Sequence, residues 1–338
     1  MNRRHLLLAF AMVVATLAPH PAQAAGRPDL IELSVANPPA AIARGMTITF
    51  QDEAKNRGTA PARSSTTGYY LSLDRVRSTN DRSVAARGVP RLPAGKTSIG
   101  TRSMTIPAST PLGKYFVLAC ADRGKVVTES REGNNCRSSE TRVQVKAPTP
   151  CQSQLIALGH PFQLGPATKG VVDPIRLTTP LNDIVFVNGS GLENTSLMMD
   201  CTLTLALDRV TIDLDARGIE SLQHYGIYNY RCIGAGIPDD QGYCPSGVSM
   251  HAYATAIDFA SFTGNGNIYS VLDDWVGGPA DDNTCSATPA NAEDQFLHEL
   301  VCYWDAENIF NIILTPNYND AHDNHFHADL TPGADFIE

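Results

Sequence analysis

The sequence predicts a multidomain protein with an N-terminal all-β, immunoglobulin-like sandwich and a C-terminal α+β domain. Charge divides the chain in two: residues 25–150 contain 19 Lys and Arg against 10 Asp and Glu (net +9), and residues 151–338 contain 5 against 25 (net −20). The hydrophobic pattern changes near the same point, from short alternating segments to segments with helical spacing. We therefore expect domains at residues 28–146 and 151–338, joined by a proline-containing linker at 147–150.

The first 24 residues have the features of a secretory signal peptide. An arginine pair precedes an apolar run at residues 6–18, and small residues at 22 and 24 form a cleavage site. The run is short for a membrane-spanning helix, and an uncleaved anchor is the alternative. We expect cleavage near residue 24, export to the periplasm or the extracellular space, and no stable membrane insertion of the mature chain.

In the N-terminal domain, short apolar segments alternate with turn-forming residues. Four segments have the pattern of strands: residues 46–50, 68–73, 113–119 and 141–145. Strands at this spacing predict a β-sandwich. The positive charge predicts attraction to anionic polymers of the cell envelope. Docking against the acidic domain, or a solvated surface without a partner, are the alternatives.

Residues 127–135 form a turn rich in Glu and Asn. Glu129, Glu132, Asn134 and Asn135 offer oxygen atoms that suit Ca²⁺. Side chains of this kind also satisfy backbone groups within turns, so a structural turn is the competing interpretation.

The C-terminal domain is expected to contain both helices and strands. We expect helices at residues 196–212 and 294–306, strands at 226–232, 254–262 and 310–314, and loops at 234–247 and 316–324. In a strand at 254–262, one face would present Ala254, Ala256, Asp258 and Ala260. A carboxylate in a row of small side chains leaves room for a metal ion and a substrate. The loop at 234–247, rich in glycine and proline, is a candidate rim for such a site.

Two separated segments of this domain carry metal-ligating residue types. His251 and Asp258 lie in the first, and His322, His325 and His327 lie in the second. An isolated histidine is more often structural, but three histidines within six residues favour a functional site. A catalytic zinc typically takes three protein ligands and leaves one position for water. The five side chains therefore suffice to bind zinc and to move protons.

These two segments resemble the extensin-like C-terminal family, which is similar to the zinc D-Ala-D-Ala peptidases and the LAS-type murein endopeptidases. The first motif of the family is Ser-x-His-x-x-Gly-x-Ala-x-Asp, and it is matched by Ser249, His251, Ala256 and Asp258. Ala254 occupies the glycine position. The second motif is His-x-x-His-x-His, matched by His322, His325 and His327. The resemblance covers about residues 151–332 and implies a zinc-peptidase-like fold of the LAS and Hedgehog type.

The resemblance also implies roles for these side chains. His251, Asp258 and His327 would bind zinc, His325 would act as general base toward the attacking water, and His322 would stabilise the transition state. Ala254 restricts the backbone where relatives have glycine.

Three further residues are candidate substrate ligands. Arg231 suits a substrate carboxylate or phosphate, although relatives carry the arginine after the cysteine rather than before it; a surface salt bridge is the alternative. Ser249 either binds a ligand or caps its own motif, and no nucleophile elbow surrounds it, which argues against a serine hydrolase. Trp275 either lines the cleft or belongs to the core.

The N-terminal domain resembles a CARDB domain, a bacterial adhesion-related module. The matching segments are residues 55–58, 70–74, 92–95 and 127–135. The resemblance implies no catalytic residues in this domain.

Eight cysteines in an exported chain predict four disulfides. Cys120 and Cys136 both lie in the first domain, and a bond between Cys151 and Cys201 fits the second. The remaining four allow three pairings: Cys232, Cys244, Cys285 and Cys302. The extensin-like resemblance favours Cys232 with Cys302, which leaves Cys244 with Cys285.

The features together predict an exported, zinc-dependent peptidase that hydrolyses peptide bonds in cell-wall peptidoglycan. The alternative is a non-catalytic envelope-binding or adhesion protein with a structural or vestigial metal site. Nucleic-acid binding is not expected, because the chain has no recognised motif for it and its larger half is strongly acidic.

Overall fold

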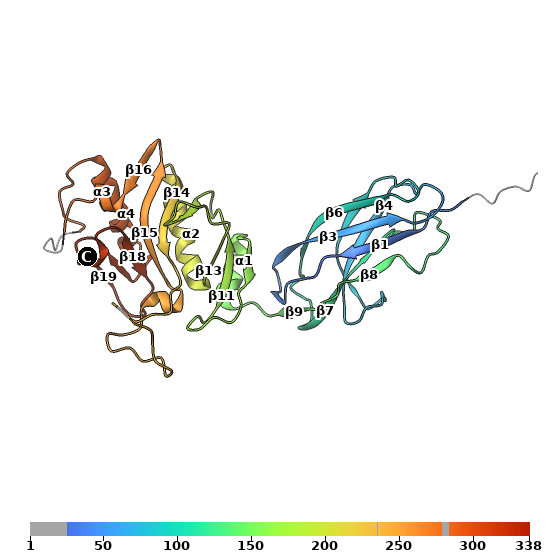
Figure 1. Cartoon of the computed structure of the whole chain (residues 1–338), viewed down its shortest axis with the longest axis horizontal. Helices are drawn as coiled ribbons and strands as arrows, with labels where there is room; N and C mark the ends of the chain where they lie inside the picture. Colours follow the sequence, from blue (N-terminus) through green and yellow to red (C-terminus); the bar gives the residue numbers. More distant parts are fainter. Residues whose placement is uncertain (1–25, 235, 279–283) are drawn as a thin grey trace, which may run out of the picture.

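The computed structural model describes residues 26–234, 236–278 and 284–338. The predicted signal peptide at residues 1–24 lies outside them. Figure 1 shows two units that follow each other along the chain, with the first unit built from strands. None of the described helices has the length and hydrophobicity needed to cross a membrane.

The N-terminal unit consists of two packed β-sheets, which confirms the all-β prediction. Its strands are β1 (Leu30–Val35), β2 (Ala41–Ala43), β3 (Thr47–Asn56), β4 (Ser65–Ser72), β5 (Arg82–Val89), β6 (Thr97–Thr105), β7 (Gly113–Cys120), β8 (Cys136–Ser138) and β9 (Val143–Lys146). One sheet has the order β1-β3-β6, and the other has the order β2-β9-β7-β4-β5, with β8 paired to β7. Phe50 and Met104 of the first sheet and Tyr69 and Val117 of the second belong to one buried core.

A buried ion pair joins the two sheets. Asp52 of β3 accepts hydrogen bonds from the Arg87 side chain of β5 at 2.6 and 2.5 Å, and the Tyr69 hydroxyl also donates to Asp52. Glu32 lies beside this pair and accepts a hydrogen bond from Thr67. Burial, followed by the charge of Asp52, raises the pKa of Glu32 to about 9.

The Glu- and Asn-rich turn at residues 127–135 is satisfied from within the chain. Glu129 accepts hydrogen bonds from the backbone N–H of Leu30 and from the Asn135 side chain, and Glu132 accepts one from the backbone N–H of Glu129. The side chain of Asn134 donates to Asp29. These bonds favour the structural interpretation of the turn over a calcium site.

The C-terminal unit is mostly β-structure with few helices. Its elements are α1 (Pro150–Leu158), β10 (Phe162–Leu164), β11 (Pro174–Thr178), β12 (Val185–Asn188), β13 (Ser196–Asp200), α2 (Cys201–Ala216), β14 (Ile219–Gly226), η1 (Met250–Tyr253), β15 (Ala256–Gly264), β16 (Asn267–Ser270), α3 (Val271–Asp274), α4 (Ala292–Ala306), β17 (Ile312–Leu314), η2 (Asp320–His322), β18 (Phe326–Asp329) and β19 (Phe336–Ile337). The main sheet has the order β12-β14-β15-β18-β17-β19, with β16 paired to β15.

Helix α4 covers the apolar face of the main sheet. Trp304 packs against Phe259 and Phe262 of β15, with ring centroids 5.0 and 6.0 Å apart. Side chains alternate along a strand, so Asp258 projects from the opposite face. The fold therefore separates a packed face from a face that can carry chemistry.

Several expected elements begin or end at different residues. The helix expected from residue 196 begins at Cys201, because Asp200 caps it by accepting a hydrogen bond from the backbone N–H of Thr202. Residues 196–200 instead form β13, paired with β11. The strand expected at 226–232 ends at Gly226, since it pairs along 219–226 as β14. The strand expected at 254–262 begins only at Ala256.

The disulfides confirm two expected pairs and correct the other two. Cys120 is bonded to Cys136 and Cys151 to Cys201, as expected. The pairing favoured by the family resemblance is wrong: Cys232 is bonded to Cys244, and Cys285 to Cys302. Cys232 and Cys244 close the loop that precedes η1, whereas Cys302 lies on α4, beneath the other face of the sheet.

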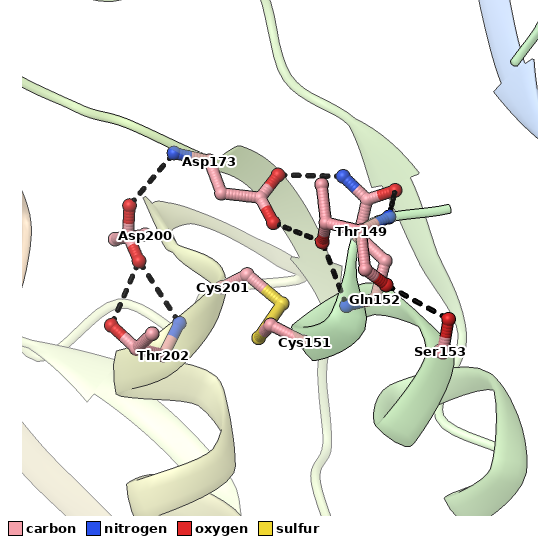
Figure 2. The surroundings of a disulfide bond; sticks show 8 residues. All are labelled: Thr149, Cys151, Gln152, Ser153, Asp173, Asp200, Cys201 and Thr202. Carbon is pink, nitrogen blue, oxygen red and sulfur yellow. Dashed lines mark hydrogen bonds between the residues drawn. A yellow bond between two sulfur atoms is a disulfide. The ribbon is translucent and has the colours of Figure 1, made fainter. Parts of the chain in front are cut away.

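The Cys151–Cys201 disulfide joins the first turns of α1 and α2 (Figure 2). Thr149 caps α1 in a capping box with Gln152, and both side chains donate to Asp173. The expected linker at 147–150 is therefore shorter, because its last two residues already belong to the C-terminal unit.

Candidate metal centre

Two neighbouring strands and one short helix bring the predicted ligands together. Asp258 of β15 and His327 of β18 are directly opposed in the antiparallel register. His251 comes from η1, which ends just before β15. The atoms His251 Nε2, Asp258 Oδ1 and His327 Nδ1 lie 2.9 to 3.2 Å from one another. Three side chains separated by up to 76 positions thus converge on one point.

The backbone at Ala254 makes this convergence possible. Ala254 adopts the left-handed conformation (φ 55°, ψ 33°), and its N–H donates to the carbonyls of His251 and Met250. This residue ends η1 and turns the chain into β15, so that His251 lies over Asp258. Glycine adopts such a conformation most readily, which explains the glycine in the family motif.

The outer nitrogens of both ligand histidines are held by acceptors. His251 Nδ1 donates to the backbone carbonyl of Ile227 at 2.9 Å, and His327 Nε2 donates to Asp329 Oδ2 at 3.0 Å. When the two rings are neutral, their inner nitrogens therefore present lone pairs toward each other, 3.2 Å apart. Two facing acceptors beside a carboxylate require a cation or a proton between them.

Electrostatics within the cluster stabilise its charged forms. Burial would raise the pKa of Asp258, but the interactions with His251 and His327, at their strongest when these rings are protonated, outweigh burial and hold that pKa far below its usual range. Burial would likewise lower the pKa of His327, but hydrogen bonds to Asp258 and Asp329 raise it to about 9. Asp258 is therefore an anion throughout the physiological pH range.

His325 and His322 lie at the edge of the cluster. His325 Nε2 is 3.6 Å from Asp258 Oδ1, while its Nδ1 donates to Asn324 at 2.7 Å. His322 Nδ1 donates to Asn319 at 2.8 Å, and the rings of His322 and His325 are 5.2 Å apart. Burial lowers the pKa of both rings, to about 4 for His322. Both are therefore neutral at physiological pH.

The three predicted substrate ligands occupy different environments. Ser249 is buried and caps η1 by accepting a hydrogen bond from the backbone N–H of His251 at 3.3 Å. Trp275 is in the core, stacked on His298 at 3.9 Å and edge-on to Phe326 at 5.2 Å, so the cleft-lining interpretation does not apply. Arg231 is half-buried, and its charge reaches His322, whose pKa it helps to lower.

The residues that orient the histidines were not predicted. Asp329 lies two positions after His327 on the same strand, so period-two alternation could have placed its carboxylate on the ligand face. The carbonyl of Ile227 carries no sequence signal, because any residue supplies one.

The family comparisons divide the chain in the same way as its fold. Residues 182–336 match the family described as extensin-like protein C-terminus, and residues 27–139 match the CARDB family. No curated protein matches the chain.

Several solved structures resemble parts of the chain. The CARDB domain of a Pyrococcus furiosus protein is 21% identical and covers 36% of this chain and 96% of that domain, with a TM-score of 0.27. A cell-surface protein domain from Methanosarcina acetivorans is 17% identical and covers 36% of this chain and 93% of that domain, with a TM-score of 0.27. A β-glucosidase from Listeria innocua is 15% identical and covers 36% of this chain and 16% of that enzyme, with a TM-score of 0.24.

Proposed function

We propose that this cell-surface chain, which combines a CARDB domain with an extensin-like C-terminal region, is a zinc-dependent peptidase that acts on the peptides of peptidoglycan. The observation that carries the proposal is the convergence of His251 Nε2, Asp258 Oδ1 and His327 Nδ1. The other ring nitrogen of each histidine is hydrogen-bonded to a backbone carbonyl or a carboxylate. Ligand histidines in zinc sites typically donate their outer N–H to a carbonyl or a carboxylate in this way.

The spacing of the three atoms fits zinc. Ligands at about 2.0–2.1 Å in a tetrahedral arrangement lie about 3.3 Å from one another. The corresponding separations in this chain are 2.9 to 3.2 Å, so only a small expansion is needed. Two histidines and one carboxylate also match the donor set of known catalytic zinc sites.

The proposed reaction assigns a role to each polar side chain. Zinc, when bound, supplies a Lewis acid that polarises the scissile carbonyl and acidifies water. His325 is neutral, has Nε2 free of the bond to Asn324, and lies within reach of the ligand cluster, so it accepts the proton of the attacking water. His322 gives its Nδ1 proton to Asn319, so it would stabilise the developing oxyanion only after its Nε2 takes a second proton.

Arg231 is proposed to bind a carboxylate of the substrate. The C-terminal domain contains only five Lys and Arg residues, and among its described residues Arg231 has no ion-pair partner. An unpaired guanidinium beside His322 offers a planar set of donors to a peptide carboxylate. Peptidoglycan peptides carry such groups, and the export that the disulfides indicate places the chain where this substrate occurs.

A second function is supported by the form of the cluster without metal. A proton on His327, favoured by its raised pKa, would join the same three side chains as a buried ionic network. In that case the domain would bind the cell envelope without hydrolysing it.

Digestion of purified sacculi separates the two functions. The mature protein is incubated with sacculi and zinc, and released peptides are measured beside the His325→Ala variant. We expect release by the wild type to fall by about 10²–10⁴-fold in the variant, the usual contribution of a general base. His160→Gln, which removes a histidine bonded to Asp208, serves as a control and should retain activity. Retention on sacculi without release, in wild type and variant alike, would leave only the binding function.

A further inference from the structure

The outer face of the CARDB sheet carries arginines in a regular row. Strands β4 and β7 pair so that Ser72 opposes Phe116, Tyr70 opposes Leu118, and Gly68 opposes Cys120. These three rungs point away from the core between the sheets, and successive rungs are about 7 Å apart along the strands. Side chains on such a face would ordinarily be polar, yet Tyr70, Phe116 and Leu118 are buried. Basic side chains lie over two of them, Tyr70 and Phe116.

Each rung has its own guanidinium group. The guanidinium carbons of Arg75 and Arg142 both lie 4.6 Å from the centre of the Phe116 ring. Arg77 lies 3.9 Å from the centre of the Tyr70 ring. At the third rung, a Cβ atom on Gly68 would meet the side chain of Arg123 at 2.9 Å, so this arginine covers the glycine. We call these four residues the arginine row: Arg75, Arg77, Arg123 and Arg142.

The positions of the arginine row leave donors available. A guanidinium that lies over an aromatic ring can still form bidentate bonds to an anion through N–H groups at its edge. All four residues are exposed. The bonds already made are few: Arg75 donates to the backbone carbonyl of Glu140, and Arg77 forms an ion pair with Asp81 at 3.6 Å.

A cavity of about 570 Å³ adjoins the second and third rungs. Its lining includes Arg77, Arg123 and Lys125 together with the hydroxyl groups of Ser78 and Thr79.

Two carboxylates also line this cavity, and both already accept hydrogen bonds. Asp122 accepts from the backbone N–H groups of Val126 and Val127, and Glu132 accepts from the backbone N–H of Glu129. The three cations exceed the two carboxylates by one positive charge, and they are the charged hydrogen-bond donors of the cavity wall.

We propose that the arginine row and this cavity bind a linear anionic polysaccharide that carries carboxylate or sulfate groups. The row extends over three rungs, which suits charges repeated along an extended chain. The hydroxyl groups of the cavity suit the hydroxyls of sugars. Arginine side chains cover the rings of Phe116 and Tyr70, so these rings are not available to stack with bases. This argues against single-stranded nucleic acid as the ligand.

The acidic domain of the same chain is poorly placed to occupy the cavity. Gly113, at the start of β7, pairs with Val145 of β9, which leads into the C-terminal unit. Cys120, at the other end of β7, borders the cavity. The cavity therefore borders the end of β7 away from β9, and Figure 1 shows β9 beside the connection to the second unit. This inference does not depend on the proposed peptidase activity.

Binding of defined polymers tests the inference on the full mature chain. Affinity is measured by calorimetry for polygalacturonate and dextran sulfate, with neutral dextran as the uncharged reference. The variant Arg77→Gln/Arg123→Gln/Arg142→Gln should bind both anionic polymers at least about tenfold more weakly, because it loses three charge-assisted contacts. Neutral dextran should not bind.

A matched variant removes the same charge elsewhere. Three exposed residues serve for this: Arg102 on β6 of the other sheet, and Arg91 and Lys96 in the segment that leads into β6. Their replacement by Gln should change affinity by less than about twofold. Equal losses in the two variants would mean general charge attraction and would overturn the inference.

A lysine variant tests whether the planar guanidinium groups are needed in addition to their charge. Arg77→Lys/Arg123→Lys/Arg142→Lys keeps the charge but loses the planar donors, and affinity should fall about threefold or more. Wild-type affinity in this variant would contradict recognition by planar guanidinium groups. Self-association that depends on the arginine row, without polymer binding, would identify the acidic domain of a second copy as the occupant and would also overturn the inference.

Discussion

Ala254 is the residue whose backbone most directly shapes the candidate metal centre. Its left-handed conformation costs an L-residue about 1–2 kcal/mol. Replacing it by glycine removes this cost, but it also loosens the unfolded chain by about 0.4–1 kcal/mol and removes a fully buried methyl worth about 0.8 kcal/mol. We therefore expect Ala254→Gly to change the free energy of unfolding by less than about 1 kcal/mol, as measured by urea denaturation.

Ala254→Val is the informative contrast. A β-branched side chain is strongly disfavoured at positive φ, and no space surrounds this position. The variant should lose about 2–4 kcal/mol of stability, as overpacking and backbone strain add. A loss no greater than that of the glycine variant would mean that the backbone at 254 does not determine the geometry of the centre.

Glu32 provides a prediction for pH dependence. Its folded pKa of about 9 exceeds the value of 4.5 for an unperturbed glutamate, so the folded chain retains a proton that the unfolded chain releases. Stability from this group is fully present below the unfolded pKa and is lost as pH rises toward 9. Glu32→Gln keeps a hydrogen-bond donor toward Asp52 and cannot ionise. Its advantage over the wild type should grow by about 1 kcal/mol or more between pH 5 and pH 8.

Urea denaturation of wild type and variant at both pH values measures this difference. Because all other groups are shared, the difference isolates Glu32. A constant difference across the pH range would show that Glu32 ionises normally in the folded chain.

At the scale of elements, β18 is held from two sides. Phe326 packs on Trp275 in the core, and Asp329 holds the ring of His327 on the opposite face. Asp329→Asn keeps the size of the side chain but weakens its bond to the imidazole. We expect zinc affinity to fall about 10–100-fold, the usual effect of removing an outer partner. Competition with a chromophoric chelator measures it, and an unchanged affinity would mean that Asp329 does not orient this ligand.

The disulfide pairing is open to direct measurement. Proteolysis without reduction, followed by mass spectrometry, should yield peptides joined through Cys232–Cys244 and Cys285–Cys302. Peptides joined through Cys232 and Cys302 would instead support the pairing favoured by the family resemblance. They would also require the loop before η1 to lie against α4.

Elements that are determined by their own sequence could be predicted, whereas features that depend on distant segments could not. Helix α4 was predicted closely, because its apolar spacing lies within the segment itself. The start of α2 was not, because Asp200 acts both as a strand residue paired in β13 and as a helix cap. The motif histidines were found by their spacing, whereas the acceptors behind them depend on pairings between distant strands. The pairing of the last four cysteines likewise depends on how distant segments are brought together by the fold.

The whole molecule consists of two units with separate proposed tasks. The basic unit presents exposed arginines on a rigid sheet, and the acidic unit presents one converging set of ligands. The change of charge at the junction was visible in the sequence, and the fold divides there as well. The arginine row was not predicted, because it arises only when β4 and β7 are paired in register.

Zinc should stabilise the acidic unit. A ligand that binds only the folded state adds about 2.7 kcal/mol at one hundred times its Kd. Thermal unfolding should therefore shift upward with added zinc and downward with a chelator, and Asp258→Asn should abolish both shifts. The transition of the CARDB domain should not move, which provides an internal control.

The most direct test of the central claim is the metal content of the mature protein, measured by mass spectrometry for wild type and Asp258→Ala. The account predicts about one zinc per wild-type chain and its loss in the variant, with the fold of the variant checked by circular dichroism. A wild-type protein that contains no metal and takes up none from added zinc would contradict the account. The converging histidines would then be a buried ionic network in an envelope-binding protein.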